Sequence, residues 1–259
     1  MMWSALNPEL PVLQGKRVWL VGASSGIGAA LARQALAEGA QVILSARRQS
    51  ALETVAAGHP QAWVMPLDVL DPQAWTAAYA SIKARWDGID LIVFCAADYR
   101  PERSWEVAPQ QAWQTLQVNL ASVYTGLATV LPDMLAKGQG GIGLIASVAG
   151  YMGLPNATVY GPSKAALINL AEILYTDLHG KGLAVYLVNP GFVKTGLTAK
   201  NDFSMPALQT PEQAAREIWQ GIRRGRFEIH FPRRFTRVLK VLQLLPYRWR
   251  FALLSRLLG

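Results

Sequence analysis

The sequence is poor in several residue types, and each shortage excludes a class of protein. Cys95 is the only cysteine among 259 residues, which excludes a disulfide within the chain and a cysteine-based metal cage. No stretch reaches the ~18 uninterrupted apolar residues of a membrane span. Residues 1–14 lack the basic start and the apolar run of a secretory signal. We therefore expect a cytoplasmic protein in a reducing compartment.

Acidic residues are scarce at the C-terminal end. Residues 223–259 hold ten Arg and Lys against one acid, Glu228, a local charge of +9 in a chain whose net charge is +8. The other 222 residues therefore carry −1, and they offer no basic face to nucleic acid. With 51% hydrophobic and 16% charged residues, the chain is globular and long enough for one large α/β core.

Short apolar runs alternate with longer segments of helical periodicity. Buried parallel strands are predicted at 17–21, 41–46, 62–67, 89–95, 141–147 and 183–189. Helices are predicted at 26–38, 49–57, 72–86, 109–136 and 157–179, then a helix at 211–223 and a short seventh strand at 227–230. The order predicts an α/β fold, a Rossmann-type doubly wound parallel sheet with helices on both faces. We expect one domain, 1–230, and a helical appendage, 231–259.

A glycine-rich segment joins the first predicted strand to the first predicted helix. Gly22 permits a sharp turn, while Gly26 and Gly28 allow a pyrophosphate to approach the backbone closely. The start of the helix then offers free N–H groups to the anion. The predicted cofactor loop consists of Gly22, Ser24, Ser25, Gly26, Ile27 and Gly28. A glycine-rich turn without a ligand is the alternative.

The end of the second predicted strand indicates which cofactor binds. It has no Asp or Glu to accept from the ribose 2′-OH of NAD. Arg47, assisted by Ser45, can instead bind a 2′-phosphate, so NADP(H) is favoured over NAD(H). Alternatively, Arg47 and Arg48 are solvated surface charges. Asp68 is a candidate acceptor for the adenine amino group, or an acid near the start of a helix.

Tyr160 and Lys164 are four residues apart, on one face of a predicted helix. A phenol has a pKa of about 10, and acid–base work near neutrality needs a shift worth about 4 kcal/mol. An ammonium at about 4 Å supplies about 4 kcal/mol at an effective dielectric near 20. Ser147 ends the fifth predicted strand, and Asn119 occupies a helix interior that Asn disfavours.

With these residues the chain resembles the short-chain dehydrogenase/reductase family, over roughly residues 13–230. The motifs are Gly22-x-x-x-Gly26-x-Gly28, Asn119, Ser147, Tyr160-x-x-x-Lys164 and Asn189-Pro190-Gly191-x-x-x-Thr195. The resemblance implies an NADP(H)-dependent oxidoreductase that interconverts a carbonyl and a secondary alcohol. It also implies a homodimer or homotetramer assembled through helices 109–136 and 157–179.

The resemblance further implies a role for each motif residue. Tyr160 is the expected general acid or base. Lys164 is expected to lower the pKa of Tyr160 and to bind the nicotinamide ribose. Ser147 is expected to orient the substrate oxygen, and Asn119 to hold a relay water. Further cofactor contacts are expected from Ala96, Pro190, Gly191, Val193 and Thr195.

The chain departs from the family pattern at two places. Val21 stands where the family commonly has Thr before the first glycine. The fourth strand ends in Phe94-Cys95-Ala96-Ala97, where the family usually has Asn-Asn-Ala-Gly. Phe94 or Cys95 must then pack in place of an asparagine that braces the strands. We expect Cys95 to be a small buried hydrophobe, not a reactive thiol.

The substrate side is expected to be apolar. Residues 196–209 are the expected lid. The apolar residues of the lid and of the pocket around it are Leu197, Phe203, Met205, Leu208, Tyr151, Met152, Leu154 and Phe192. Lys194 and Lys200 are the possible anchors for a charged substrate, and solvated side chains are the alternative. We expect a lipid-like, steroid-like or aromatic carbonyl or alcohol.

The C-terminal appendage combines an apolar stripe with arginines. The stripe at helical spacing comprises Phe235, Val238, Leu239, Leu242, Leu245, Trp249, Leu253, Leu254, Leu257 and Leu258. Arg233, Arg234, Arg237, Lys240, Arg248, Arg250 and Arg256 lie beside it. Peripheral contact with a membrane surface and docking on the same chain or a second subunit stay open, while nucleic acid is disfavoured.

Two other functions stay open. A cofactor-binding sensor or scaffold without catalysis is one, although it has no need of the Tyr160 acid. A nucleotide-sugar epimerase or dehydratase on a related fold is the other. Those chains are usually longer, with a different glycine spacing, whereas only about 60 residues follow Thr195 here.

Overall fold

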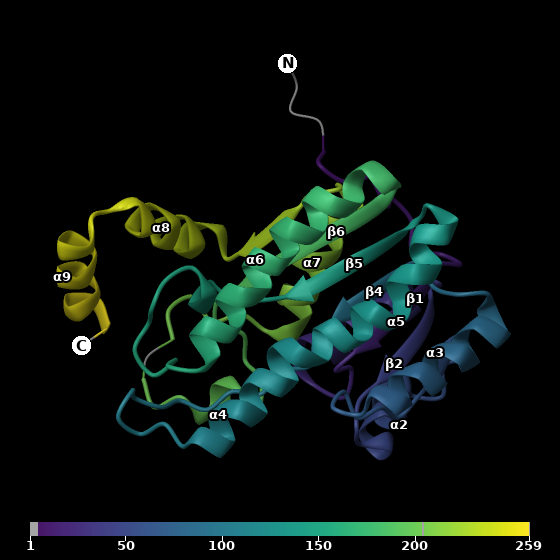
Figure 1. Ribbon diagram of the computed structural model, residues 1–259, viewed down its shortest axis with the longest axis horizontal. Helices are drawn as coiled ribbons and strands as arrows, with labels where there is room; N and C mark the ends of the chain where they lie inside the picture. The colour runs from purple at the N-terminus through teal and green to yellow at the C-terminus, as the bar shows by residue number, and fades with distance from the viewer. Residues whose placement is uncertain (1–4, 204, 259) are drawn as a thin grey trace.

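The computed structural model describes residues 5–203 and 205–258, with side chains up to residue 254, and it shows a parallel sheet between two layers of helices (Figure 1). The strands follow the order β3-β2-β1-β4-β5-β6-β7. They are β1 (Arg17–Val21), β2 (Gln41–Ser45), β3 (Ala62–Val64), β4 (Leu91–Phe94), β5 (Gly140–Ile145), β6 (Leu183–Pro190) and β7 (Glu228–Phe231). The predicted doubly wound sheet is confirmed.

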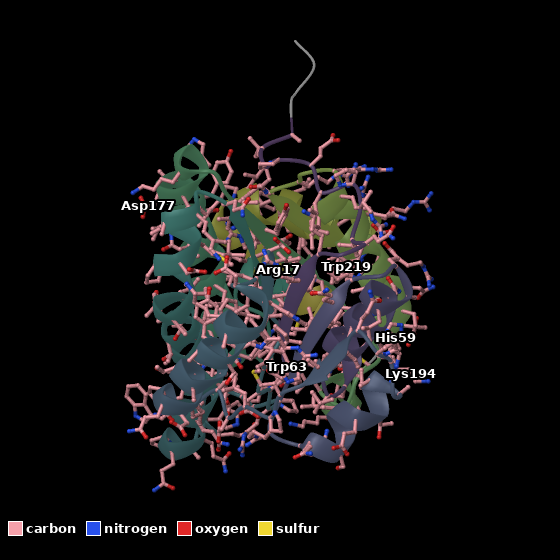
Figure 2. The ribbon with its side chains drawn as sticks, turned by 90° about the vertical axis from the view of Figure 1, so that its right-hand side faces the viewer. Arg17, His59, Trp63, Asp177, Lys194 and Trp219 are labelled. Carbon is pink, nitrogen blue, oxygen red and sulfur yellow. The ribbon has the colours of Figure 1, made fainter. Side chains whose placement is uncertain are left out.

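The helices cover both faces of the sheet and leave the strands as apolar runs. They are α1 (Gly26–Ala37), α2 (Gln49–Ala56), α3 (Pro72–Trp86), α4 (Pro109–Leu116), α5 (Ser122–Lys137), α6 (Tyr160–Leu178), α7 (Pro211–Arg223), α8 (Arg233–Leu244) and α9 (Tyr247–Leu258). On one face Trp219 of α7 packs with Leu31 of α1 and donates to its carbonyl at 3.3 Å (Figure 2). On the other face, Trp75 of α3, Leu127 of α5 and Leu167 of α6 share one core.

The predicted helix over residues 109–136 is confirmed as a continuous helical run, but it is not α-helical throughout. A π-helical turn, Gln117–Ala121, separates α4 from α5. It contains Asn119, whose side chain hydrogen-bonds across to Asp98 and Ser163. A π-helical turn is a local widening that often accompanies a functional position. The mediocre helix propensity of asparagine was therefore a real signal of irregular structure.

Several predicted boundaries move. The third strand ends at Val64, short of residue 67, although the N–H groups of Met65 and Leu67 still donate to the carbonyls of Leu44 and Ala46, at 3.0 Å each. The fifth strand ends at Ile145, and Ser147 instead begins a 3₁₀ turn, where its hydroxyl accepts from the backbone N–H of Ala149 at 3.1 Å. The helix expected from residue 157 begins at Tyr160.

After β7 the chain forms two helices, α8 and α9, which lie at the side of the molecule as the yellow end of the ribbon in Figure 1. We call them the C-terminal helix pair. Their inner face, which we define as Leu239, Leu242 and Leu254, packs with Val148, Tyr151 and Met152. Docking on the same chain, one of the open alternatives, is thus confirmed for these leucines. The side chains of Arg256, Leu257 and Leu258 lie outside the described residues.

Two further points concern the whole chain. Within the described ranges no helix is both long and apolar enough to cross a membrane. The division into a domain, 1–230, and an appendage, 231–259, stays a prediction. The N-terminal segment is tied to the sheet, because the Asn7 side chain pairs with the backbone N–H and carbonyl of Val185, at 3.0 and 2.7 Å.

Candidate active site

A cleft of about 1210 Å³ opens at the carboxyl ends of the central strands. The strand order reverses between β1 and β4, the place where doubly wound sheets bind ligands. Most of the predicted site residues line this cleft: Gly22, Ser24, Ser25, Gly26, Ile27, Gly28, Arg47, Asp68, Ala96, Ser147, Tyr160, Lys164, Pro190, Gly191, Val193 and Thr195. Ser45 and Asn119 are the two that do not.

The glycine loop forms a cradle at one end of the cleft. Gly22 has a φ of +95°, and a Cβ placed there would lie 2.4 Å from the backbone nitrogen of Ala96. No residue with a side chain fits this approach of two chain segments. α1 begins at Gly26, and its N-cap residue, Ser25, makes no side-chain cap. The first N–H groups of α1 are thus free for an anion, which fits the pyrophosphate of a dinucleotide.

Ser45 lies inside the sheet and not at the cleft. Its side chain is fully buried, and its hydroxyl accepts from Trp19 Nε1 at 2.9 Å. The alternation of side chains along β2 turns this hydroxyl toward the core. Its predicted help with a 2′-phosphate is therefore wrong.

Arg47, two residues further along the chain, is exposed at the edge of the cleft. It makes no ion pair or hydrogen bond with any described residue. Arg48 also lines the cleft. Asp68 is exposed in the cleft wall, and its Oδ1 accepts from the Leu70 N–H at 3.0 Å. Asp71 and not Asp68 caps the following helix, α3.

Tyr160 and Lys164 occupy the first turn of α6, where α6 meets the cleft. Lys164 is 2% exposed, and its Nζ donates to the Ile145 carbonyl at 2.8 Å. Nζ lies 5.5 Å from the centroid of the Tyr160 ring. Burial lowers the pKa of Lys164 to about 8.

The pKa of Tyr160 moves in the direction opposite to the one expected. Burial raises it to about 12, and a hydrogen bond with Ser147 only partly opposes this rise. The sequence-based expectation counted the stabilisation of the phenolate by the Lys164 ammonium but not the cost of removing the phenolate from water. That desolvation cost is the larger of the two here. At neutral pH the phenol therefore keeps its proton.

Asn119 holds two elements together from beneath the cleft. Its Nδ2 donates to the Asp98 carbonyl at 2.9 Å and to Ser163 Oγ at 3.0 Å. Its Oδ1 accepts from the Asp98 N–H at 2.7 Å. Both amide hydrogens are thus used within the protein, and the side chain is 1% exposed. The water relay through Asn119 stays a prediction, and this side chain could serve it only through its oxygen.

Tyr99 is a site residue that the sequence did not reveal. Its ring meets the Tyr160 ring edge-on, with 4.8 Å between the centroids. Its hydroxyl donates to Asn201 Oδ1 at 2.7 Å, and its carbonyl accepts from Lys200 Nζ at 2.6 Å. Both partners belong to the expected lid, so Tyr99 connects that segment to Tyr160. Lys200, for which solvation was the alternative, is thus partnered.

The unusual end of β4 is accommodated by packing. Phe94 is buried against Trp75, with 6.0 Å between the ring centroids, so the expectation that it packs is confirmed. Gly126 of α5 makes room, because a Cβ there would lie 2.5 Å from Phe94 Cε1. Cys95, expected to be buried, is partly exposed in the cleft wall but packs against the core, and this loss of solvent raises the pKa of its thiol to about 12. The thiol therefore stays protonated.

The expected substrate side is only partly as predicted. Leu154, Phe192, Leu197 and Phe203 line the cleft, and the Phe192 and Phe203 rings are 5.9 Å apart. Tyr151 and Met152 pack against the C-terminal helix pair instead, and Met205 and Leu208 do not line the cleft. Exposed charges that the sequence did not reveal stand at the rim: Arg103, Glu106 and Asp202. Lys194 is exposed at the edge of the molecule (Figure 2).

Comparison with known proteins agrees with this geometry. The model of a family described as short chain dehydrogenase matches residues 16–204. An uncharacterized oxidoreductase of Myxococcus xanthus (strain DK1622) is 33% identical over 230 residues, which cover 86% of this chain and 91% of that protein.

Two solved structures share the fold. A short chain dehydrogenase from Burkholderia cenocepacia J2315 in complex with NADP has a TM-score of 0.82 at 22% identity, covering 96% of this chain and 99% of that one. A short chain dehydrogenase/reductase from Burkholderia phymatum in complex with NAD has a TM-score of 0.79 at 23% identity, covering 88% and 92%. The chain therefore belongs to the short-chain dehydrogenase/reductase family of oxidoreductases, whose fold binds a nicotinamide cofactor.

Proposed function

We propose that the protein is an NADP(H)-dependent oxidoreductase that interconverts a carbonyl and a secondary alcohol on a moderately apolar substrate, and that it works as a carbonyl reductase. One observation carries the proposal: Tyr160 stands in the cleft with Ser147 and Lys164, and Lys164 Nζ lies 5.5 Å from the centre of the Tyr160 ring. A phenol whose pKa is raised to about 12 holds its proton at neutral pH but is a weak acid, so its proton transfer depends on a nearby cation that stabilises the phenolate.

Each catalytic residue then has a defined role. Tyr160 donates its proton to the carbonyl oxygen. Ser147, whose Oγ accepts from the Ala149 N–H and which also hydrogen-bonds Tyr160, would turn its hydroxyl to the substrate and polarise that oxygen. Lys164 binds the nicotinamide ribose and favours the anion that Tyr160 leaves behind. Asn119 holds the segment after β4 in register with α6. The bound nicotinamide supplies the hydride.

The preference for NADP(H) rests on the end of β2. The exposed guanidinium of Arg47 faces the cleft edge without a partner among the described residues, and no acid stands beside it. A 2′-phosphate would gain a charge-assisted, bidentate contact there. Asp68 would accept from the adenine amino group. The remaining proposed contacts are the loop from Gly22 to Gly28 together with Ala96, Pro190, Gly191, Val193 and Thr195.

We also propose a homodimer or homotetramer, located in the cytoplasm and attached peripherally to a membrane. Tyr124 on α5 and Ile173 on α6 are large apolar residues about half exposed, which supports an interface on this helix layer. Sedimentation velocity of the purified protein tests the assembly.

The test of the activity follows NADPH absorbance over a panel of apolar ketones and aldehydes. Tyr160→Phe should lower turnover by at least about a hundredfold, the usual contribution of a general acid, while NADPH still binds. Tyr124→Phe, an exposed tyrosine on α5, is the matched control. Full turnover in Tyr160→Phe would remove the acid role. NADPH binding without turnover of any carbonyl would favour the sensor or scaffold. Turnover of a nucleotide sugar without net oxidation of NADPH would favour the epimerase or dehydratase.

A further inference from the structure

The C-terminal helix pair has a second apolar surface that no described part of the chain covers. Its outer face consists of large side chains that are 56% to 85% exposed: Val238, Val241, Leu244, Tyr247, Trp249 and Phe251. Exposed apolar residues scattered singly are ordinary, but a continuous set of them marks an interaction surface. All six lie within 14 consecutive residues of α8 and α9, and Trp249, two residues from both Tyr247 and Phe251, points to another side of α9 than those two rings.

The outer face is ordered by helix geometry. Val238, Val241 and Leu244 follow one another at three-residue steps on α8. Tyr247 and Phe251 are one turn apart on α9, with 5.6 Å between their rings. The inner face meanwhile is held by buried leucines and by Glu228, which accepts from Lys240 Nζ and, at 2.7 Å, from the Tyr151 hydroxyl. The helix pair is thus fixed on the domain while its outer face stays exposed.

Cationic side chains accompany the outer face. Arg233, Arg234, Arg237 and Arg248 are exposed and make no ion pair with a described residue. Arg250, by contrast, donates to the carbonyls of Gln243 and Leu245. The segment 223–259 carries +9 in all. Its partner should therefore be apolar and negatively charged.

We propose that the outer face docks on an anionic phospholipid membrane. The aromatic rings and leucine would enter the boundary between headgroups and acyl chains, and the free arginines would bind lipid phosphates. A second copy of the chain complements this face poorly. A two-fold interface brings identical patches together, and here it would place two strongly cationic surfaces in contact.

The position of the helix pair connects membrane docking with the entry of substrate into the cleft. Val148 touches the inner face and also lines the cleft. Phe192, another lining residue, packs on Phe235 of α8 with 5.9 Å between their rings. The membrane would therefore lie on the substrate side of the cleft, where an apolar carbonyl dissolved in lipid could enter. This last step rests on the proposed function, whereas the docking itself does not.

The test is co-sedimentation of the full-length protein with vesicles. One set of vesicles contains phosphatidylcholine alone, and the other also contains anionic phosphatidylglycerol. The protein should pellet with the anionic vesicles only, and about 1 M salt, where the Debye length is about 3 Å, should release most of it. Phe251→Glu, and separately the pair Arg234→Glu with Arg248→Glu, should lower the vesicle partition coefficient about tenfold or more. Trp113→Glu, an exposed tryptophan on α4, is the matched control and should bind as wild type does.

Each other outcome overturns the proposal. Wild-type protein that stays in the supernatant with anionic vesicles, or Trp113→Glu that loses as much binding as Phe251→Glu, refutes docking through this face. A lipid-free dimer that Phe251→Glu dissociates, without vesicle binding, assigns the face to a second copy. NADPH binding confirms that each variant is folded. Tyr160→Phe should pellet like wild type, which separates this test from the test of the activity.

Discussion

Gly126 lies opposite Phe94, and its replacement by alanine tests how the chain accommodates a phenylalanine where its family usually has asparagine. A Cβ at position 126 would lie 2.5 Å from Phe94 Cε1 and 2.7 Å from Trp75 Cη2. Neither ring can move aside easily. Phe94 is 5% exposed, and Trp75 is fully buried with its Nε1 bound to the Val69 carbonyl at 3.1 Å.

Two effects of opposite sign set the magnitude of the Gly126→Ala change. Alanine is better than glycine inside a helix by about 1 kcal/mol. Overpacking a core costs about 1–3 kcal/mol, and contacts this short belong at the upper end of that range. We therefore expect the free energy of unfolding to fall by about 1–2 kcal/mol. For a chain of this size, that lowers Tm by about 2–8 °C.

Urea unfolding followed by circular dichroism measures the effect, and Phe94→Leu completes a double-mutant cycle. With the ring of Phe94 removed, Gly126→Ala should cost at least about 1 kcal/mol less than in the wild type, since residues in contact couple by about 0.5–3 kcal/mol. Gly180→Ala is the control, because its added Cβ meets nothing within 4 Å. A Gly126→Ala protein as stable as wild type, or the same cost in both backgrounds, would refute the reasoning.

Three further predictions concern the cofactor, the lid and the C-terminal helices. Arg47→Ala should weaken NADPH binding about tenfold or more while NADH binding changes little, because a charge-assisted bond is lost; equal weakening of both in titration calorimetry would remove the 2′-phosphate role. Tyr99→Phe keeps the aromatic ring beside Tyr160 but loses the hydrogen bond to Asn201 of the lid. KM for the carbonyl substrate should therefore rise several-fold while kcat stays nearly constant. An unchanged KM would contradict the role of Tyr99 in connecting the lid to the site. Burial opposes the ionisation of Glu228, but hydrogen bonds from Lys240, Tyr151 and Asn189 outweigh it and lower its pKa. Stability from this carboxylate is therefore present above its unfolded pKa of about 4.3 and lost as the pH falls through the lower folded value. Lys240→Met should cost about 1 kcal/mol at pH 7, the order expected of a half-exposed pair, and the deficit in urea unfolding should shrink below about pH 4; a deficit independent of pH excludes the ion pair as its cause.

Local signals made part of the fold predictable. The glycine loop sits where a strand turns into a helix, and Tyr160 and Lys164 are one helical turn apart, so sequence spacing alone places them. Side-chain alternation along β2 does not distinguish Ser45 from Leu44, because both faces of the sheet are buried: Leu44 packs in one core, and Trp19, the partner of Ser45, packs in the other.

Other features depend on contacts between distant segments. Tyr99 meets Asn201, 102 residues later, and follows no motif. The raised pKa of Tyr160 depends on how deeply the folded chain buries the phenol, which spacing to Lys164 does not reveal. The π-helical turn at Asn119 within the long helix left one trace, a residue poorly suited to a helix interior.

The attachment of α8 also bears on how the protein can be handled and redesigned. Glu228 is the only acid in the last 37 residues, and it joins β7 to Lys240, to Tyr151 and, at 2.9 Å, to Asn189 of β6. A protein truncated after residue 231 would lose the leucines that pack with Val148 and the Phe235 ring that packs on Phe192, two residues that line the cleft. A solubilising redesign should therefore change the six exposed residues one at a time and keep the two helices, because shortening the chain would alter membrane affinity and the substrate pocket together.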